Sequence, residues 1–168
     1  MMYKKLLVVI LLICIGTLQA RDTSNKWNGF RDYGWGINLE LIAEDDSDLK
    51  KTYQNKKCDL ATWRCQDEKL AIGKADLESV GYTTYKNRFC GISIKSKGRL
   101  NFEHLKDTIF TSYGKGKKCN VLRDKWVWLE ADTNGKVIAI LEWTFFNKET
   151  SFILCYSPIW EQYYANKK

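Results

Sequence analysis

The side chains that could carry acid–base chemistry in this chain are a pair of carboxylates and one histidine. Glu130 and Asp132 alternate at the end of a predicted strand, so their carboxylates would share one face, as a hydrolase or glycan-processing enzyme requires. His104, the only histidine, lies on a predicted helix without a nucleophile or an orienting acid at a motif spacing. Because acids at a strand end are usually solvated, an enzyme is the less favoured interpretation.

Seven tryptophans offer a second kind of chemistry, the stacking of rings on a ligand. Trp126, Trp128 and Trp143 fall on one face of a predicted hairpin, which makes them candidate binding residues if that face is open. A wall glycan could then stack on them, or a partner could cover them. The competing interpretation is that they fill the core, because aromatic side chains bury large areas.

The cysteines form a third group. Cys58 and Cys65 flank a short polar segment, and a disulfide that closes this loop is our first expectation. Cys90 and Cys155 fall in strand patterns typical of small buried residues, whereas Cys119 could pair with one of them or stay free. The sequence leaves the connectivity open.

No motif indicates a cofactor. The sequence has no phosphate-binding loop, no dinucleotide-binding glycine pattern and no Gly-x-Ser-x-Gly nucleophile turn. It also has no Cys-x2-Cys or paired histidines at metal-ligand spacing. We therefore expect no metal and no cofactor. We also expect no nucleic-acid partner, because basic and acidic residues are interspersed rather than gathered in a basic block.

Residues 1–20 have the layout of a secretory signal peptide. Lys4 and Lys5 precede an apolar run over residues 6–15, and cleavage is predicted after Ala20. The run is shorter than the ~20 residues that a membrane-spanning helix needs. We therefore expect an exported protein, periplasmic or extracellular, with no transmembrane segment in the mature chain.

The mature chain is mildly basic. Removing residues 1–20 takes two lysines from the 27 basic residues and leaves 25 against 20 acidic residues, a net charge of +5. Lipid anchoring at Cys14 is an alternative to cleavage after Ala20, and the bulky Ile13 before it disfavours that reading. Residues 21–168 contain one proline and no repeat, which predicts a single domain after a flexible lead-in at 21–28.

Two strand patterns and a helix pattern lie in the middle of the chain. Alternation over residues 80–94 predicts a hairpin with a three-residue loop at 86–88 and Asn87 or Arg88 in the left-handed region. This register pairs Val80 with Ile94, Tyr82 with Ile92 and Thr84 with Cys90. A helix over residues 102–113 follows, capped by Asn101 and ended by Gly114. Its apolar stripe consists of Phe102, Leu105, Ile109 and Tyr113.

A second set of strands follows the helix. Residues 126–156 predict a three-stranded meander, whose first turn is Asn134-Gly135, and Pro158 stops its last strand. That turn places Trp126 opposite Trp143 and Trp128 opposite Leu141. A short N-terminal helix, capped by Asn38, would point Leu41 and Ile42 inward. The predicted fold class is α+β, an antiparallel sheet with the 102–113 helix packed on one face.

The meander is apolar on both faces. Val127, Leu129, Ile138 and Ile140 lie on the face opposite the tryptophans, and a sheet covered by one helix should have one wet side. Either the N-terminal segment or a partner must therefore cover the second face. The favoured hypothesis is an exported, non-enzymatic protein that binds a protein or cell-envelope partner through this sheet.

One motif resembles a known group of proteins. The segment Phe30-Arg31-Asp32-Tyr33-Gly34-Trp35-Gly36, a Phe-Arg-x-aromatic-x-Trp-Gly pattern just after the signal peptide, is similar to that of small uncharacterised exported bacterial proteins. The resemblance implies a bacterial, exported, single-domain protein and brings no activity or site residue with it. Further short matches lie at residues 69–73, 80–94, 101–102, 113–116 and 158–161.

Overall fold

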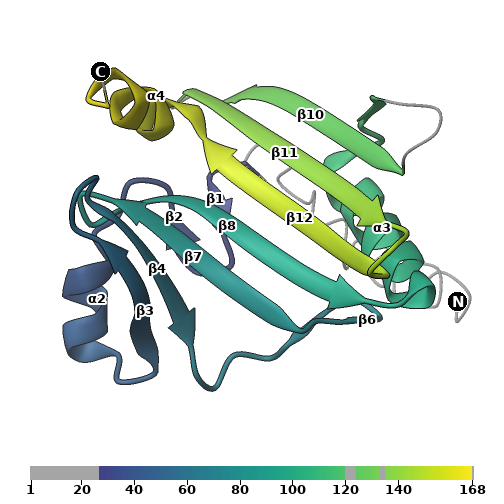
Figure 1. Cartoon of the computed structure of the whole chain (residues 1–168), viewed down its shortest axis with the longest axis horizontal. Helices are drawn as coiled ribbons and strands as arrows, with labels where there is room; N and C mark the ends of the chain where they lie inside the picture. The colour runs from purple at the N-terminus through teal and green to yellow at the C-terminus, as the bar shows by residue number, and fades with distance from the viewer. Residues whose placement is uncertain (1–26, 120–123, 133–134, 168) are drawn as a thin grey trace, which may run out of the picture.

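The computed structural model describes residues 27–119, 124–132 and 135–167 (Figure 1). In this part of the chain the protein is α+β and is dominated by one antiparallel sheet of eight strands. The predicted signal peptide, residues 1–20, lies outside the described residues. The large sheet consists of β3 (Leu49–Asn55), β4 (Leu60–Cys65), β7 (Ser79–Tyr85), β8 (Arg88–Lys97), β9 (Lys117–Lys118), β10 (Lys125–Asp132), β11 (Gly135–Thr144) and β12 (Glu149–Tyr156).

The other elements are helices and short ribbons. The helices are α2 (Leu39–Asp45), α3 (Arg99–Tyr113) and α4 (Ser157–Ala165). Two-stranded ribbons are formed by β1 (Gly29–Phe30) with β2 (Tyr33–Gly34) and by β5 (Ala71–Ile72) with β6 (Ala75–Asp76).

Two meanders make up the large sheet, in the strand order β3-β4-β7-β8-β12-β11-β10-β9. α3 carries the chain from β8 to the far edge of the sheet, where β9 begins the second meander. The last strand, β12, then returns to pair with β8, so the two meanders join in the middle of one sheet. The two meanders therefore depend on each other for the pairing of their last strands, β8 and β12.

The β7–β8 hairpin has the predicted faces but a different turn. The predicted three-residue loop is wrong, because the turn consists of Lys86 and Asn87 alone, with φ of 50° and 62°. Thr84 lies opposite Phe89 rather than Cys90, and a bulge at this point absorbs the extra residue. The apolar side chains therefore stay on one face without the longer loop. The two other predicted pairs are present, Val80 with Ile94 and Tyr82 with Ile92.

The β10–β11 register differs from the predicted one by two residues. The observed pairs are Trp126 with Leu141 and Trp128 with Ala139, instead of Trp143 and Leu141 respectively. Gly135 pairs with Asp132 and so belongs to the strand rather than to the turn. Because side chains alternate with a period of two, a shift of two residues leaves every side chain on its predicted face.

α3 begins at Arg99, three residues before the predicted start, and its N-cap is Gly98, with φ of 92° and no side-chain cap. The prediction that Asn101 caps the helix is wrong. The Asn101 Oδ1 accepts a hydrogen bond from the backbone N–H of Asp76 at 3.2 Å, which links α3 to β6. The helix ends at Gly114, with φ of 78°, as predicted.

One face of the large sheet, called here the inner face, lies under α3 and the N-terminal segment. The helix buries Phe102, Leu105 and Ile109, and the Phe102 ring centroid lies 5.9 Å from that of Trp126. Tyr33 packs edge-on against Tyr82 at 5.2 Å. One inner row crosses six strands, Trp63, Tyr82, Ile92, Leu154, Ala139 and Trp128.

The N-terminal segment therefore lies on the same face as α3. Trp35 stacks on Phe89 at 4.8 Å and on Tyr156 at 5.9 Å between ring centroids. This position overturns the alternative in which the segment covers the second face of the sheet. Trp35 of the N-terminal segment, Phe89 of β8 and Tyr156 of β12 together fill the part of the inner face that α3 does not cover.

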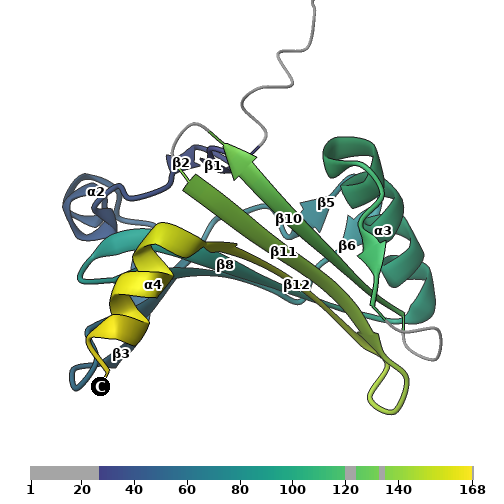
Figure 2. The same ribbon diagram turned by 90° about the horizontal axis from the view of Figure 1, so that it is seen from above.

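The opposite face, called here the outer face, carries α4 at one end, an element that the sequence pattern does not predict. Figure 2 shows α3 and α4 at opposite ends of the sheet. Pro158 stops β12 as predicted, and it also begins α4, where its fixed φ suits the first turn of a helix. Trp160 lies over Gly91. A Cβ at that position would be 3.4 Å from the indole Nε1, so the glycine leaves room for the ring. The same Nε1–H donates to the Cys90 carbonyl at 3.0 Å.

The short helix α2 has the predicted cap and a different buried side. The Asn38 Oδ1 accepts from the backbone N–H groups of Glu40 at 3.0 Å and Leu41 at 3.4 Å, which confirms the cap. Leu39 is fully buried, however, whereas Leu41 is 59% exposed, so the prediction that Leu41 points inward is wrong. The shared cap therefore does not decide which leucine is buried; packing against the rest of the chain does.

Two leucines of α3 provide a test of this packing. We expect Leu105→Ala to lower the free energy of unfolding by about 2–5 kcal/mol, because Leu105 is fully buried between helix and sheet. Leu100→Ala is the matched control on the same helix, and its 69% exposure predicts a change within about 0.5 kcal/mol. Urea unfolding followed by circular dichroism measures both. Equal losses for the two variants would contradict the assigned helix face.

Candidate functional site

The three tryptophans expected at an open binding face are buried. The exposed fractions are 6% for Trp126, 4% for Trp128 and 9% for Trp143. α3 covers them, with the Phe110 ring centroid 5.7 Å from Trp126 and 6.0 Å from Trp128. The Trp128 Nε1–H donates to the Gly114 carbonyl at 2.8 Å, which satisfies its buried polar atom. The structure therefore matches the core interpretation, and stacking on a sugar is not available to these rings in this conformation.

The Cys58–Cys65 disulfide expected from the sequence is absent, and both thiols are free. Cys58 lies in the turn before β4, and Cys65 is the last residue of that strand. An extended strand of this length separates the two residues by about 20 Å. A disulfide needs Cα atoms within ~7 Å, so the two cysteines do not meet.

The remaining candidates for chemistry do not converge on one place. Glu130 and Asp132 lie on β10, and their side chains are outside the described part of the structure. His104 lies on α3, where its Nδ1 is 3.1 Å from the Lys74 carbonyl oxygen. Within residues 27–119, 124–132 and 135–167, no group of three or more His, Cys, Asp or Glu side chains could hold a metal ion.

One buried carboxylate has a structural role that the sequence does not reveal. The Glu68 side chain, 5% exposed, accepts hydrogen bonds from the Arg31 guanidinium and from the Tyr82 hydroxyl. Burial, with the neighbouring carboxylate, raises the pKa of Tyr82 and keeps its hydroxyl protonated as a donor. Arg31 also donates to the Lys69 carbonyl at 3.0 Å. These contacts join the N-terminal segment to the inner face.

The outer face carries the apolar surface that is open to a partner. We call it the outer patch; it consists of Val127, Leu129, Ile138, Ile140 and Ile153. Leu129 pairs across the strands with Ile138, and Ile140 lies between Val127 and Ile153 on its two neighbouring strands. Leu129 is 75% exposed and Ile153 is 36% exposed, whereas the other three are half-buried.

A row of polar residues bounds the outer patch on one side. The Lys125 Nζ lies 3.1 Å from the Glu142 carboxylate, and these two residues pair directly across β10 and β11. Ser151 of β12 is the next residue in the same row. An apolar centre with a charged border is the usual composition of a protein-binding surface.

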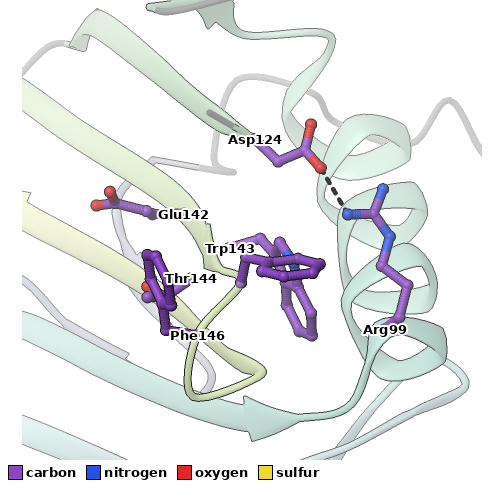
Figure 3. A pocket seen from close by; sticks show the side chains of 7 residues that line it. Arg99, Asp124, Glu142, Trp143, Thr144 and Phe146 are labelled. Carbon is purple, nitrogen blue, oxygen red and sulfur yellow. Dashed lines mark hydrogen bonds and ion pairs between the residues drawn. The ribbon is translucent and has the colours of Figure 1, made fainter. Parts of the chain in front are cut away.

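An open cleft of about 480 Å³ lies beyond this border, at the start of α3 (Figure 3). Trp143, Phe145 and Phe146 contribute apolar surface to it. The Arg99 guanidinium in its wall lies 2.6 Å from the Asp124 carboxylate and 2.6 Å from that of Glu103. Since two carboxylates already neutralise this guanidinium, none of the described lining residues offers a free cation to an anionic ligand.

The ion pair between Arg99 and Asp124 shifts the pKa of both groups toward their charged forms. Burial opposes ionisation of Asp124, but the hydrogen bond from Arg99 and the nearby positive charges outweigh it and lower the pKa of the carboxyl. The hydrogen bond that Arg99 donates to Asp124 in turn raises the pKa of Arg99. Both groups remain charged at neutral pH, so neither offers a proton for acid–base catalysis.

Comparison with protein-family models, with curated proteins and with solved structures finds no match to this chain. No helix among the described residues has the length and apolar character needed to cross a bilayer. The structure shows an α+β protein with one large antiparallel sheet. Since no related protein is found, its function has to be inferred from its surface.

Sequence reasoning identified four residues of the outer patch and missed Ile153. That residue alternates with Phe152 and Leu154 in an almost unbroken apolar strand, so periodicity does not separate its two faces. The exposed Phe145 and Phe146 were also missed. Their position beside Asn147-Lys148 could have indicated their exposure. Asparagine favours turns, and side chains in a turn do not pack on the sheet.

The thiols give a test of the cysteine assignment. Burial raises the pKa of Cys90 to about 12 and that of Cys155 to about 11, so both stay protonated at pH 8. Because only the thiolate reacts, iodoacetamide should label these two about a hundredfold more slowly than the exposed Cys119, and equally fast after unfolding. Peptide mass spectrometry measures the labelling. A Cys58–Cys65 disulfide in the same digest would contradict the strand assignment.

Proposed function

We infer that this protein is exported to the periplasm or the exterior and acts without catalysis, by binding a protein partner through the outer patch. The observation that carries this proposal is the row of directly paired apolar side chains on the outer face of β10, β11 and β12. Leu129, at 75% exposure, costs free energy in water that a covering partner would recover. Burying one such side chain contributes about 1.5–3 kcal/mol.

The position of the outer patch supports the same proposal. The chain buries the aromatic residues of the inner face under α3 and the N-terminal segment, and it covers part of the outer face with α4. The outer patch lies on the part of the outer face that β10, β11 and β12 form. On the neighbouring strands β7 and β8 the outer face carries the small residues Gly81, Thr83 and Ser93, whereas Gly91 lies under the Trp160 ring.

The other functions weighed from the sequence have less support. Wall-glycan binding rested on open tryptophans, and Trp126, Trp128 and Trp143 are all buried. A carboxylate-based hydrolase rested on Glu130 and Asp132, whose side chains lie outside the described part of the structure. Neither alternative has an observation that favours it over a binding protein.

A double substitution on the outer patch tests the proposal. Leu129→Ser with Ile153→Ser should abolish retention of a partner from periplasmic extract, or dissociate a dimer if the partner is a second copy, because both serines remove apolar contact area. Size-exclusion chromatography with light scattering and affinity capture measure the two outcomes. Since both side chains face solvent, the free energy of unfolding should change by less than about 1 kcal/mol.

The matched control places the same change elsewhere. Leu41→Ser with Tyr53→Ser removes two side chains that are each 59% exposed, on α2 and β3. These residues lie at the other edge of the molecule, so the control should bind as the unaltered protein does. Binding that survives in the outer-patch variant, or is lost equally in the control, would show that the outer patch is not the interface.

A further inference from the structure

The connection between β11 and β12 presents two consecutive phenylalanines to solvent. Phe145 is 79% exposed and Phe146 is 97% exposed, the largest exposures among the large apolar side chains of the described residues. Figure 2 shows this turn projecting beyond the sheet, at the end where α3 begins. Neither ring contacts the core, so the pair contributes nothing to folding that would explain its position.

The turn holds the rings outward by polar contacts of its own. The Asn147 Oδ1 accepts from the backbone N–H of Glu149 at 3.2 Å, and its Nδ2–H donates to the Glu149 carboxylate at 2.6 Å. The Lys148 carbonyl accepts from the Gly98 N–H at 2.9 Å, which fastens the turn to the start of α3. The two ring centroids are 6.4 Å apart and nearly perpendicular, so the rings shield little of each other.

Further apolar and basic side chains lie at the same end of the molecule. Leu100, in the first turn of α3 next to Gly98, is 69% exposed. Lys95 and Lys97 end β8 beside this turn, and Lys148 belongs to it; all three are exposed. In the described part of the chain, none of the three ammonium groups lies in an ion pair, so their charges remain free to attract an anionic surface.

We propose that this end of the protein attaches to a lipid bilayer that contains anionic headgroups. Phe145 and Phe146 enter the boundary between headgroups and acyl chains, and the lysines behind them contact lipid phosphates. Aromatic rings favour this boundary, and each nearby lysine adds attraction to an anionic membrane. Here both rings and Lys148 belong to the projecting turn, and Lys95 and Lys97 lie on the neighbouring strand, so a bilayer that meets the turn can contact both kinds of group.

A lipid surface fits this feature better than a protein does. Binding energy at a protein interface concentrates in residues packed into complementary pockets near its centre, with a polar rim around them. Here two adjacent rings, 79% and 97% exposed, project from a narrow turn. A bilayer accepts such a wedge without a complementary recess. The surface is also separate from the outer patch, so the two proposals can fail independently.

Vesicle flotation tests the proposal with the processed protein, whose N-terminus is checked by mass spectrometry so that all variants share it. The unaltered protein should float with phosphatidylcholine vesicles that contain phosphatidylglycerol, and should float less well as salt is raised. Phe145→Ser with Phe146→Ser should lower the partition coefficient at least about tenfold, because two aromatic side chains lose their apolar burial. Lys148→Gln should lower it about fivefold at low salt.

Two controls make the result decisive. The variant with Leu41→Ser and Tyr53→Ser removes two exposed apolar side chains elsewhere and should float as the unaltered protein does. Circular dichroism should show the same fold for every variant, and Lys148→Gln repeats the test without touching the rings. The proposal is overturned if the unaltered protein does not float, if the phenylalanine variant floats equally well, or if the control variant loses binding to the same extent.

Discussion

The need to cover the inner face of an eight-stranded sheet is the constraint on which the rest of this structure depends. α3 spans only part of that face, over Trp126, Trp143 and their neighbours. The remainder is closed by rings that come from the N-terminal segment, with Trp35 stacked on both Phe89 and Tyr156. Without that segment, the aromatic residues of β7, β8 and β12 would face water, at a large cost in hydrophobic free energy.

Polar groups inside this aromatic layer make its arrangement specific. The Glu68 carboxylate is almost fully buried and would be very unfavourable there without partners, which Arg31 and Tyr82 provide. The Thr84 hydroxyl accepts from the Trp63 indole at 3.1 Å on the same face. Stacking alone allows rings to slide, whereas these directional hydrogen bonds fix the N-terminal segment in one register against the sheet.

Because most of the covering elements pack on the inner face, part of the outer face stays uncovered. The surfaces on which both proposals rest are exposed for this reason. α4 covers part of the outer face near the end of β12, where Gly91 leaves room for the Trp160 ring, and Leu129 of the outer patch remains 75% exposed. The apolar outer patch and the two phenylalanines of the β11–β12 turn are therefore exposed because the chain has no further helix to place there. They lie on the second meander, at different ends of its strands, which would allow a membrane surface and a protein partner to be bound at once.

The sequence alone determined the β7–β8 hairpin, the second meander and α3, with the faces of their side chains, but it did not predict α4. Periodicity of two and of 3.6 residues placed Tyr82 with Ile92 and aligned Phe102, Leu105 and Ile109, because alternation follows directly from backbone geometry. It could not determine what depends on contacts between distant residues. The bulge opposite Thr84, the burial of Leu39 instead of Leu41, and the separation of Cys58 from Cys65 arise from packing and strand pairing.

For the outer patch too, the sequence determined which side chains share a face, and the tertiary structure determined whether that face is exposed. Val127, Leu129, Ile138 and Ile140 were recognisable from the sequence as a second apolar face, since each alternates with an inner residue. Whether that face was buried depended on where the N-terminal segment and the chain after Pro158 would pack. Only the tertiary structure decided this, because burial of a strand face is set by elements far away in sequence, and local pattern carries no record of which face they choose.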